Sequence, residues 1–93
     1  MSRIRWTAPA AEDLNRIVRY IRRDNPEAAR RVAQTIYEGC ASLTSTPNRG
    51  RKGKEPETLE LVFAPLPYIA VYRVTDSTVE ILRIWHGAQQ RTD

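Results

Sequence analysis

The chain has 93 residues, of which 41% are hydrophobic and 28% are charged. This length and composition predict a single soluble globular domain over residues 1–93 and exclude a disordered chain. No apolar run approaches the roughly 18 residues that cross a bilayer. Basic residues near the N-terminus have no apolar stretch after them, so we expect no signal peptide. Cys40 is the only cysteine, which excludes an internal disulfide and indicates a cytoplasmic protein.

The balance of charge is basic, with a formal net charge of +4 and a pI near 9.7. It favours an acidic partner, which could be nucleic acid, a ribonucleoprotein or an acidic protein segment. Charge alone does not choose among these three.

The first half of the chain predicts a short strand and a helical hairpin. Residues 3–6 alternate basic and apolar side chains, as a strand does. Thr7 suits the N-cap of a helix to about Asp24, with Glu12-Asp13 in the first turns, where the helix dipole favours acids. Asn25-Pro26 then starts a second helix, as N-cap and first helical residue, which runs to about Thr46. Because the connection is so short, the two helices must lie antiparallel.

The second half predicts a basic loop and three strands. Arg49–Lys54 is expected to be a flexible loop whose four positive charges equal the net charge of the chain. From Thr58 to Phe63 the apolar residues recur with period two. Two further strands, Tyr68–Thr75 and Thr78–His86, are joined at Asp76-Ser77. The predicted fold class is α+β, with an N-terminal strand and an antiparallel helical hairpin packed on one face of a small antiparallel sheet, in the order β-α-α-β-β-β.

A two-residue turn at Asp76-Ser77 would fix the register of the last two strands. One face is then expected to meet the helices, through Tyr68, Ala70, Tyr72, Val74, Val79, Ile81, Arg83 and Trp85. The other face would expose four aliphatic side chains: Ile69, Val71, Leu82 and Ile84. A sheet covered on one side normally alternates apolar and polar residues, so we predict that a protein partner covers these four. A modest exposed patch, or cover from the C-terminal tail, is the alternative.

Short motifs in the same order along the chain resemble the ParE/RelE superfamily of bacterial toxins. They are Trp6 with Ala11-Glu12-Asp13-Leu14, Tyr20-Ile21, Asn25-Pro26, Asn48-Arg49-Gly50-Arg51, Glu60-Leu61-Val62, Leu66-Pro67-Tyr68-Ile69, Val71-Tyr72-Arg73, Ile81-Leu82-Arg83-Ile84 and His86-Gly87-Ala88-Gln89. The resemblance implies a stress or plasmid-maintenance toxin of a type II toxin–antitoxin system. It also implies a hetero-oligomer with an antitoxin encoded beside it.

The superfamily has two activities on one fold, and the resemblance is closer to ParE. RelE-like toxins cleave mRNA in the ribosome, with basic residues and a Tyr, His or Glu around the sheet. The RelE-like pattern places an arginine where this chain has Ile69, another where it has Leu59, and a tyrosine in a tail that has none here. The resemblance therefore implies inhibition of DNA gyrase without catalysis. The alternatives are a ribosome-dependent mRNA endonuclease and an inactive toxin-derived binding module.

The chemistry of RNA cleavage gives an independent check on the nuclease alternative. Attack by the 2′-OH needs a general base, a general acid and cations for the charged transition state. His86 and Arg73 would be the catalytic residues of a nuclease, but the expected register separates them by roughly 20 Å. His86 is otherwise expected to be a strand-end histidine that bonds to backbone, and Arg83 to pair with an acid in the helix layer. We therefore expect no catalytic residue, metal or cofactor.

Two surfaces remain as predicted contacts. The basic loop is the candidate for contact with nucleic acid or with gyrase-bound DNA, through Arg49, Arg51, Lys52 and Lys54; a merely solvated loop is the alternative. The aliphatic face is the candidate for the antitoxin, through Ile69, Val71, Leu82 and Ile84. No contact with a membrane is expected.

Overall fold

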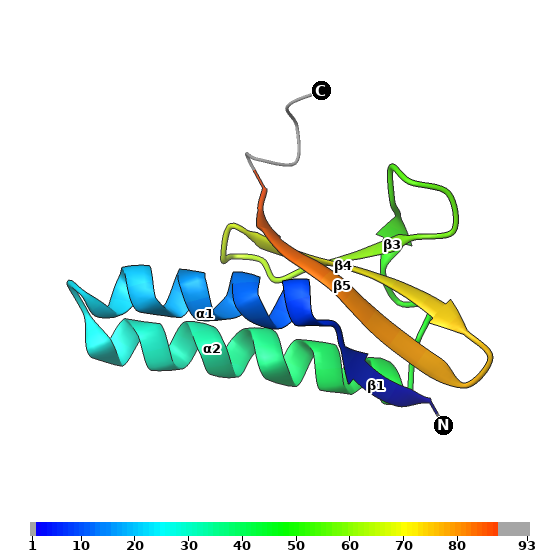
Figure 1. Cartoon of the computed structure of the whole chain (residues 1–93), viewed down its shortest axis with the longest axis horizontal. Helices are drawn as coiled ribbons and strands as arrows, with labels where there is room; N and C mark the ends of the chain where they lie inside the picture. Colours follow the sequence, from blue (N-terminus) through cyan, green and yellow to red (C-terminus); the bar gives the residue numbers. More distant parts are fainter. Residues whose placement is uncertain (1, 88–93) are drawn as a thin grey trace.

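A helical hairpin lies against one side of a twisted sheet in the computed structural model, which describes residues 2–87 (Figure 1). The elements are β1 (Arg3–Trp6), α1 (Ala8–Arg22), α2 (Pro26–Ala41), the 3-10 turn η1 (Ser42–Thr44), β2 (Arg51–Lys52), β3 (Leu59–Val62), β4 (Tyr68–Thr75) and β5 (Thr78–His86). The predicted α+β class, element order and layers are confirmed, with β2 as an unexpected addition inside the basic loop. None of the helices within residues 2–87 is long and apolar enough to cross a membrane.

Both helices begin where the sequence predicts. The Thr7 hydroxyl accepts from the Ala10 amide at 3.4 Å, and the Asn25 side chain accepts from the Ala28 amide at 3.1 Å. These bonds satisfy amides that the first helical turn leaves without partners. The second helix ends earlier than the predicted Thr46, because the Ser42 hydroxyl donates to the Gly39 carbonyl at 2.6 Å and the chain tightens into η1.

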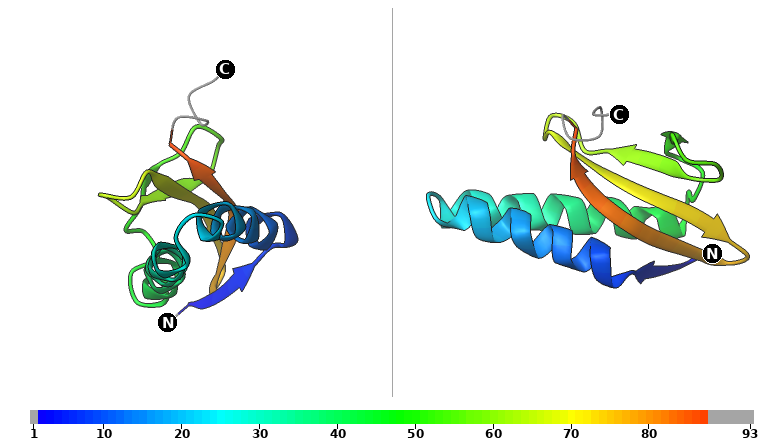
Figure 2. Two further views of the ribbon diagram at one scale, coloured as in Figure 1. Left: turned by 90° about the vertical axis from the view of Figure 1, so that its left-hand side faces the viewer. Right: turned by 45° about the horizontal axis from the view of Figure 1, so that its top comes forward.

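The sheet has five strands in the order β1-β5-β4-β3-β2, and it is mixed. β1 runs parallel to β5, from Arg3 opposite Thr78 to Trp6 opposite Ile81. The prediction of a wholly antiparallel sheet is therefore wrong. A parallel pair needs a long connection, and here the hairpin of helices and three strands separate β1 from β5. The left-hand view of Figure 2 shows β1 beside β5, against the ends of the helices.

The β4–β5 hairpin has the predicted two-residue turn but only half of the predicted register. Thr75 pairs with Thr78, and Asp76 takes a φ of 51° that the tight turn requires. The predicted pairs hold as far as Tyr72 opposite Ile81. A β-bulge follows, because Val71 faces Arg83 and leaves Leu82 without a partner. Beyond this point the regular register, which pairs Ala70 with Arg83, Ile69 with Ile84 and Tyr68 with Trp85, is wrong. Ala70 instead faces Ile84, Ile69 faces Trp85 and Tyr68 faces His86.

The bulge lies where β1 ends. The Thr7 hydroxyl donates to the Ile81 carbonyl at 2.8 Å and lies 3.2 Å from the Leu82 carbonyl, and the Thr7 amide also donates to Ile81 at 3.1 Å. Thr7 therefore caps α1 and also contacts the bulge residue, Leu82, and the residue before it. A period-two pattern carries no signal for this long-range contact.

The core lies between the helices and the sheet. Its largest fully buried side chains are Ile36, Cys40, Leu43, Tyr72, Val79 and Ile81. Burial raises the pKa of the Cys40 thiol to about 12, so the thiol stays protonated and inert at neutral pH. Ile84 also belongs to this core, with an exposed fraction of 2%, because the bulge turns it towards the helices.

Candidate functional site

The face of the sheet that points away from the helices, called the open face below, carries three rows of side chains. Residues directly opposite one another on neighbouring strands share a face, so the register defines the rows. They are Arg5, Glu80 and Arg73; then Arg51, Glu60, Val71 and Arg83; then Val62, Ile69 and Trp85. On β4, neighbouring rows lie two residues apart, or about 7 Å. The right-hand view of Figure 2 shows β3, β4 and β5, which carry most of these residues, above the helices.

The arginines of the open face are held by carboxylates that are largely buried. Arg73 donates from Nε to Glu80 at 2.7 Å, and Arg5 lies 3.0 Å from the other Glu80 oxygen. Arg51 donates from Nε to Glu60 at 3.0 Å. The carboxylate side chains are only 13% and 6% exposed, whereas the three arginines are at least half exposed. The hydrogen bond from Arg73 lowers the pKa of Glu80 against the opposing effect of burial, and the charges of Arg73 and Arg5 add to it.

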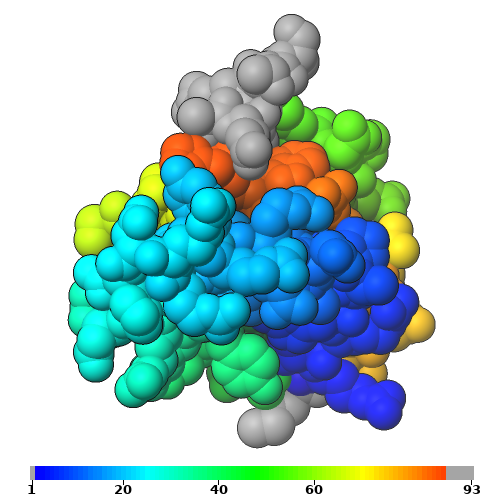
Figure 3. Space-filling model, turned by 60° about the vertical axis from the view of Figure 1, so that its left-hand side comes forward, coloured from blue at the N-terminus to red at the C-terminus, as the bar shows by residue number. Residues whose placement is uncertain are grey.

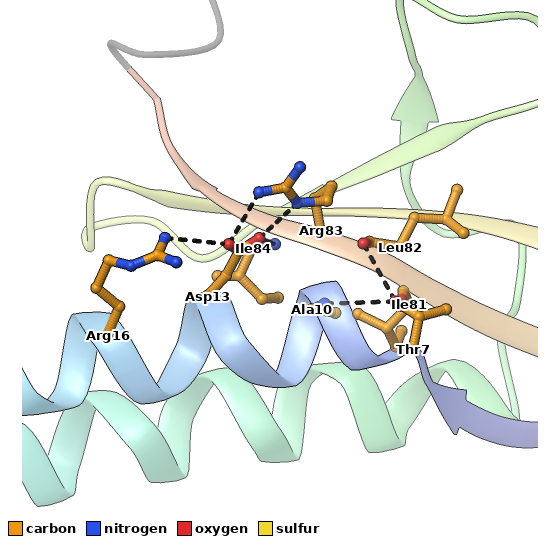
Figure 4. A network of polar contacts seen from close by, with 8 residues as sticks. All are labelled: Thr7, Ala10, Asp13, Arg16, Ile81, Leu82, Arg83 and Ile84. Atoms are coloured by element: carbon orange, nitrogen blue, oxygen red, sulfur yellow. Dashed lines mark hydrogen bonds and ion pairs between the residues drawn. The ribbon is translucent and has the colours of Figure 1, made fainter.

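Asp13 is the most connected polar group near this face (Figure 4). Its carboxylate accepts two hydrogen bonds from Arg83, at 2.7 and 3.0 Å, and one from the Ile84 amide at 3.0 Å. Arg16, one turn along α1, is 3.5 Å away. Asp13 therefore joins α1 to the part of β5 beyond the end of β1, where β4 is the only neighbouring strand.

The expected role of Asp13 was wrong, whereas that of Arg83 is confirmed in part. Because α1 begins at Ala8, Asp13 lies beyond the first turn and its carboxylate points at β5, not at the helix N-terminus. Arg83 does pair with an acid of the helix layer, although its position on β5 belongs to the open face. Burial alone would raise the pKa of Asp13, but the hydrogen bonds from Arg83 and Ile84 and the charges of Arg83 and Arg16 lower it below 3.8.

A groove of about 720 Å³ runs along the end of β5 beside α1. Figure 3 shows the last part of β5 (orange) exposed above α1 (blue). Its lining is rich in aromatic and basic side chains: Arg16, Tyr20, Lys54, Tyr68, Arg83, Trp85 and His86. Arg83 also lies 5.6 Å over the Trp85 ring, in cation–π geometry.

The exposed aliphatic face predicted for the antitoxin does not exist in this form. Ile69, Val71 and Ile84 are 6%, 8% and 2% exposed, and Leu82 is the half-buried bulge residue. The bulge removes Ile84 from the open face and puts Arg83 and Trp85 there. The assumption that these four side chains form an exposed face was wrong. Contact of the antitoxin with them remains a prediction, but exposure no longer supports it.

The two residues proposed for a nuclease are not brought together. Arg73 is bound to Glu80, and Glu80 is six residues before His86 on β5, which corresponds to roughly 20 Å. His86 instead meets Tyr68 edge to face, with ring centroids 5.6 Å apart. Burial and the nearby Tyr20 raise the pKa of Tyr68, so this phenol stays protonated at neutral pH.

The basic loop contains the short strand β2, which was not predicted, and its four cations point to different places. Arg49 donates to the Ser42 hydroxyl at 2.7 Å, and Arg51 is bound to Glu60 on the open face. Lys52 lies exposed on β2, and Lys54 lines the groove. The loop therefore does not form one cluster of cations.

Three residues of the site were not predicted from the sequence: Asp13, Glu60 and Trp85. Asp13 gave a signal, since it follows Ala10 by three residues and precedes Ile17 by four, which puts an acid on the apolar stripe of a helix. Glu60 and Trp85 gave none, because their places depend on β2 and on the bulge. Within residues 2–87 no group of three or more His, Cys, Asp or Glu side chains could hold a metal ion.

The fold defines a small α+β domain, and comparisons with known proteins identify its family. The model of the ParE toxin of type II toxin–antitoxin systems, parDE, matches residues 4–91. The chain therefore belongs to the ParE toxin family of type II toxin–antitoxin systems.

Relatives and solved structures agree with this assignment over nearly the whole chain. The Sinorhizobium fredii protein Y4kP is 44% identical over 88 residues, which cover 95% of this chain and 91% of the relative. Toxin RelE2 of Caulobacter vibrioides is 41% identical over 90 residues, 96% of this chain and 99% of the relative. A structure of the chromosomal ParDE toxin–antitoxin system of P. aeruginosa superposes with a TM-score of 0.85 and 31% identity, over 92% of this chain and 96% of that one. The names are divided between ParE and RelE.

Proposed function

We propose that this toxin inhibits DNA gyrase without catalysis of its own and is neutralised in the cytoplasm by a cognate antitoxin. Membership of the ParE family supports the first part. The likeness to the P. aeruginosa ParDE system, whose name includes an antitoxin, supports the second. We expect the antitoxin to be acidic, because the chain carries a net charge of +4.

The observation that carries the proposal is the pairing of the open-face arginines. A nuclease needs cations whose charge is available to the phosphorane-like transition state. On the open face, Arg5, Arg51, Arg73 and Arg83 each lie against a carboxylate that is at most 13% exposed, so much of their charge is already compensated. Such a face can still bind a partner through the exposed N–H groups of the arginines, but it is poorly suited to phosphoryl chemistry.

A ribosome-dependent mRNA endonuclease is the second candidate, and the groove favours it. There the contact between His86 and Tyr68 would supply a base and an acid, beside Arg83 and Lys54. The relative named RelE2 points the same way. A third reading, an inactive binding module, requires that expression without the antitoxin leave cell growth unaffected.

His86→Ala separates the first two candidates. If the protein is a gyrase inhibitor, we expect the variant to inhibit supercoiling or trap cleaved DNA within about twofold of the parent, since an exposed strand-end side chain contributes little to stability. If it is a nuclease, loss of the acid or base lowers cleavage by about 10² to 10⁴-fold. The measurements are gyrase supercoiling on plasmid DNA and primer extension on ribosome-bound mRNA.

Tyr68→Phe is the companion variant, because it removes only the hydroxyl of the other member of the pair. mRNA cut between codon positions by the parent protein, and lost in both variants, would overturn the gyrase proposal. Inhibited supercoiling with intact mRNA in all three proteins would support it.

A further inference from the structure

The tip of the helical hairpin concentrates the positive charge of the molecule. Residues 19–31 contain five arginines, Arg19, Arg22, Arg23, Arg30 and Arg31, and two acids, Asp24 and Glu27, which gives a net charge of +3 out of +4 for the whole chain. At a rise of 1.5 Å per residue, all five lie within about 8 Å of the turn between α1 and α2 along the helix axes. The hairpin extends beyond the end of the sheet (Figures 1 and 2), so the tip is free on several sides.

These arginines differ from those of the open face in having no carboxylate to hold them. Within residues 2–87 the side chains of Arg19, Arg22, Arg23 and Arg30 make no hydrogen bond or ion pair with another side chain, and all four are exposed. Arg31 has one long ion pair, 3.9 Å to Glu27. On an ordinary solvent-exposed helix face, acidic and basic side chains alternate. At the hairpin tip, the charges of four guanidinium groups are not compensated by a bound acidic side chain.

Helix stability explains only part of this cluster. Arg19 and Arg22 lie in the last turn of α1, where the helix dipole favours cations. Arg30 and Arg31 lie in the second turn of α2, nearer its N-terminus, where the dipole gives cations no support. The repulsion between these arginines is therefore not compensated within the domain, which indicates that the cluster binds an anion from outside it.

We infer that the hairpin tip binds the phosphate backbone of nucleic acid without reading its sequence. Guanidinium groups pair with phosphate through two parallel N–H donors. The core of a protein interface is instead apolar and depleted of charge. Within residues 2–87 the exposed large hydrophobic residues are Tyr20, Tyr37 and Val62, of which only Tyr20 belongs to the tip. The inference does not depend on which target the toxin inhibits.

The test is the salt dependence of binding to a short duplex DNA and to a single-stranded RNA, measured by fluorescence anisotropy with purified toxin. Four neutralised phosphates predict that affinity for the duplex falls about 100-fold between about 50 and 200 mM salt. In R19Q/R22Q/R23Q/R30Q the fall should shrink to less than about 5-fold. Tighter binding of DNA would assign the tip to DNA held by the target, and tighter binding of RNA would assign it to the ribosome.

R3Q/R49Q/K52Q/K54Q is the comparison variant, because it removes the same number of positive charges from β1 and from the basic loop, the competing predicted contact with nucleic acid. If the tip and not the loop is the binding site, the comparison variant should bind much as the parent does. It should keep most of the salt dependence. The inference is overturned if the parent toxin does not bind either nucleic acid at about 50 mM salt, or if both variants lose binding equally. It is also overturned if the tip variant binds nucleic acid normally but loses an acidic protein partner. If circular dichroism shows that the fourfold variant folds poorly, R22Q/R23Q replaces it. Its effect on the slope of log affinity against log salt concentration should be half as large.

Discussion

Asp13→Ala should lower the free energy of unfolding by about 3 kcal/mol, the cost of breaking a buried ion pair from one side. The side chain is 4% exposed, and its loss leaves the Ile84 amide without its acceptor and Arg83 without its anion. For a domain of this size the melting temperature should fall by about 15 °C. Thermal and urea unfolding followed by circular dichroism measure both quantities.

Glu12→Ala is the matched control, since the neighbouring acid is exposed. It should change stability by less than about 0.5 kcal/mol. Equal effects of the two substitutions would show that Asp13 contributes only surface charge and would refute its role as the link between α1 and β5.

Stability should also depend on pH through Asp13. Its pKa in the folded protein is lower than the ordinary 3.8, so the folded state binds a proton less readily than the unfolded chain does. The carboxylate then contributes its full stability well above pH 3.8, and this contribution declines as the pH falls through 3.8 towards the lowered pKa. Asp13→Asn should flatten the acid side of the stability curve; an unchanged curve would argue against the depressed pKa.

Tyr72→Phe should cost about 2 kcal/mol and loosen the basic loop. The fully buried Tyr72 donates its hydroxyl to the Pro47 carbonyl at 2.8 Å and accepts from the Gly50 amide at 2.9 Å. Phenylalanine keeps the ring but leaves two backbone groups of the loop without partners, at about 1 kcal/mol or more each. Limited trypsin digestion should cut faster after Arg49, Arg51 and Lys52 while circular dichroism stays native.

Tyr37→Phe is the control, because that hydroxyl lies on an exposed side chain. It should leave both stability and the rate of cleavage unchanged. Cleavage of the loop at the parental rate in Tyr72→Phe would mean that β2, and not the tyrosine, holds the loop.

The fold could be predicted because its signals are local. Thr7 and Asn25 cap helices through contacts three residues away, and the turn at Asp76-Ser77 needs only its own geometry. The direction of β1 and the bulge at Leu82 were missed because both depend on contacts more than 70 residues apart, such as Thr7 with Ile81. Local patterns carry no information on such pairs.

The missed bulge is the main reason why the candidate site was predicted incorrectly. A regular ladder puts Arg83 and Trp85 on the helix side and four aliphatic residues outside, which is the interpretation that the sequence favours. With Leu82 out of the ladder, Ile84 enters the core and Arg83 reaches Asp13. Nuclease chemistry is therefore disfavoured on the open face because its cations are already paired with carboxylates, and not because cations are missing.

The bulge also bears on how relatives of this chain can differ in length. One residue added to or lost from a strand usually turns every later side chain over to the opposite face. Here Leu82 stands outside the pairing, so a chain without it would still pair Ile81 with Tyr72 and Arg83 with Val71, and residues 83–86 would keep their faces. A gap at position 82 in an alignment of the family therefore indicates a straighter strand with the same surface. A gap at a paired position of β5 indicates instead a strand whose later side chains lie on the opposite face.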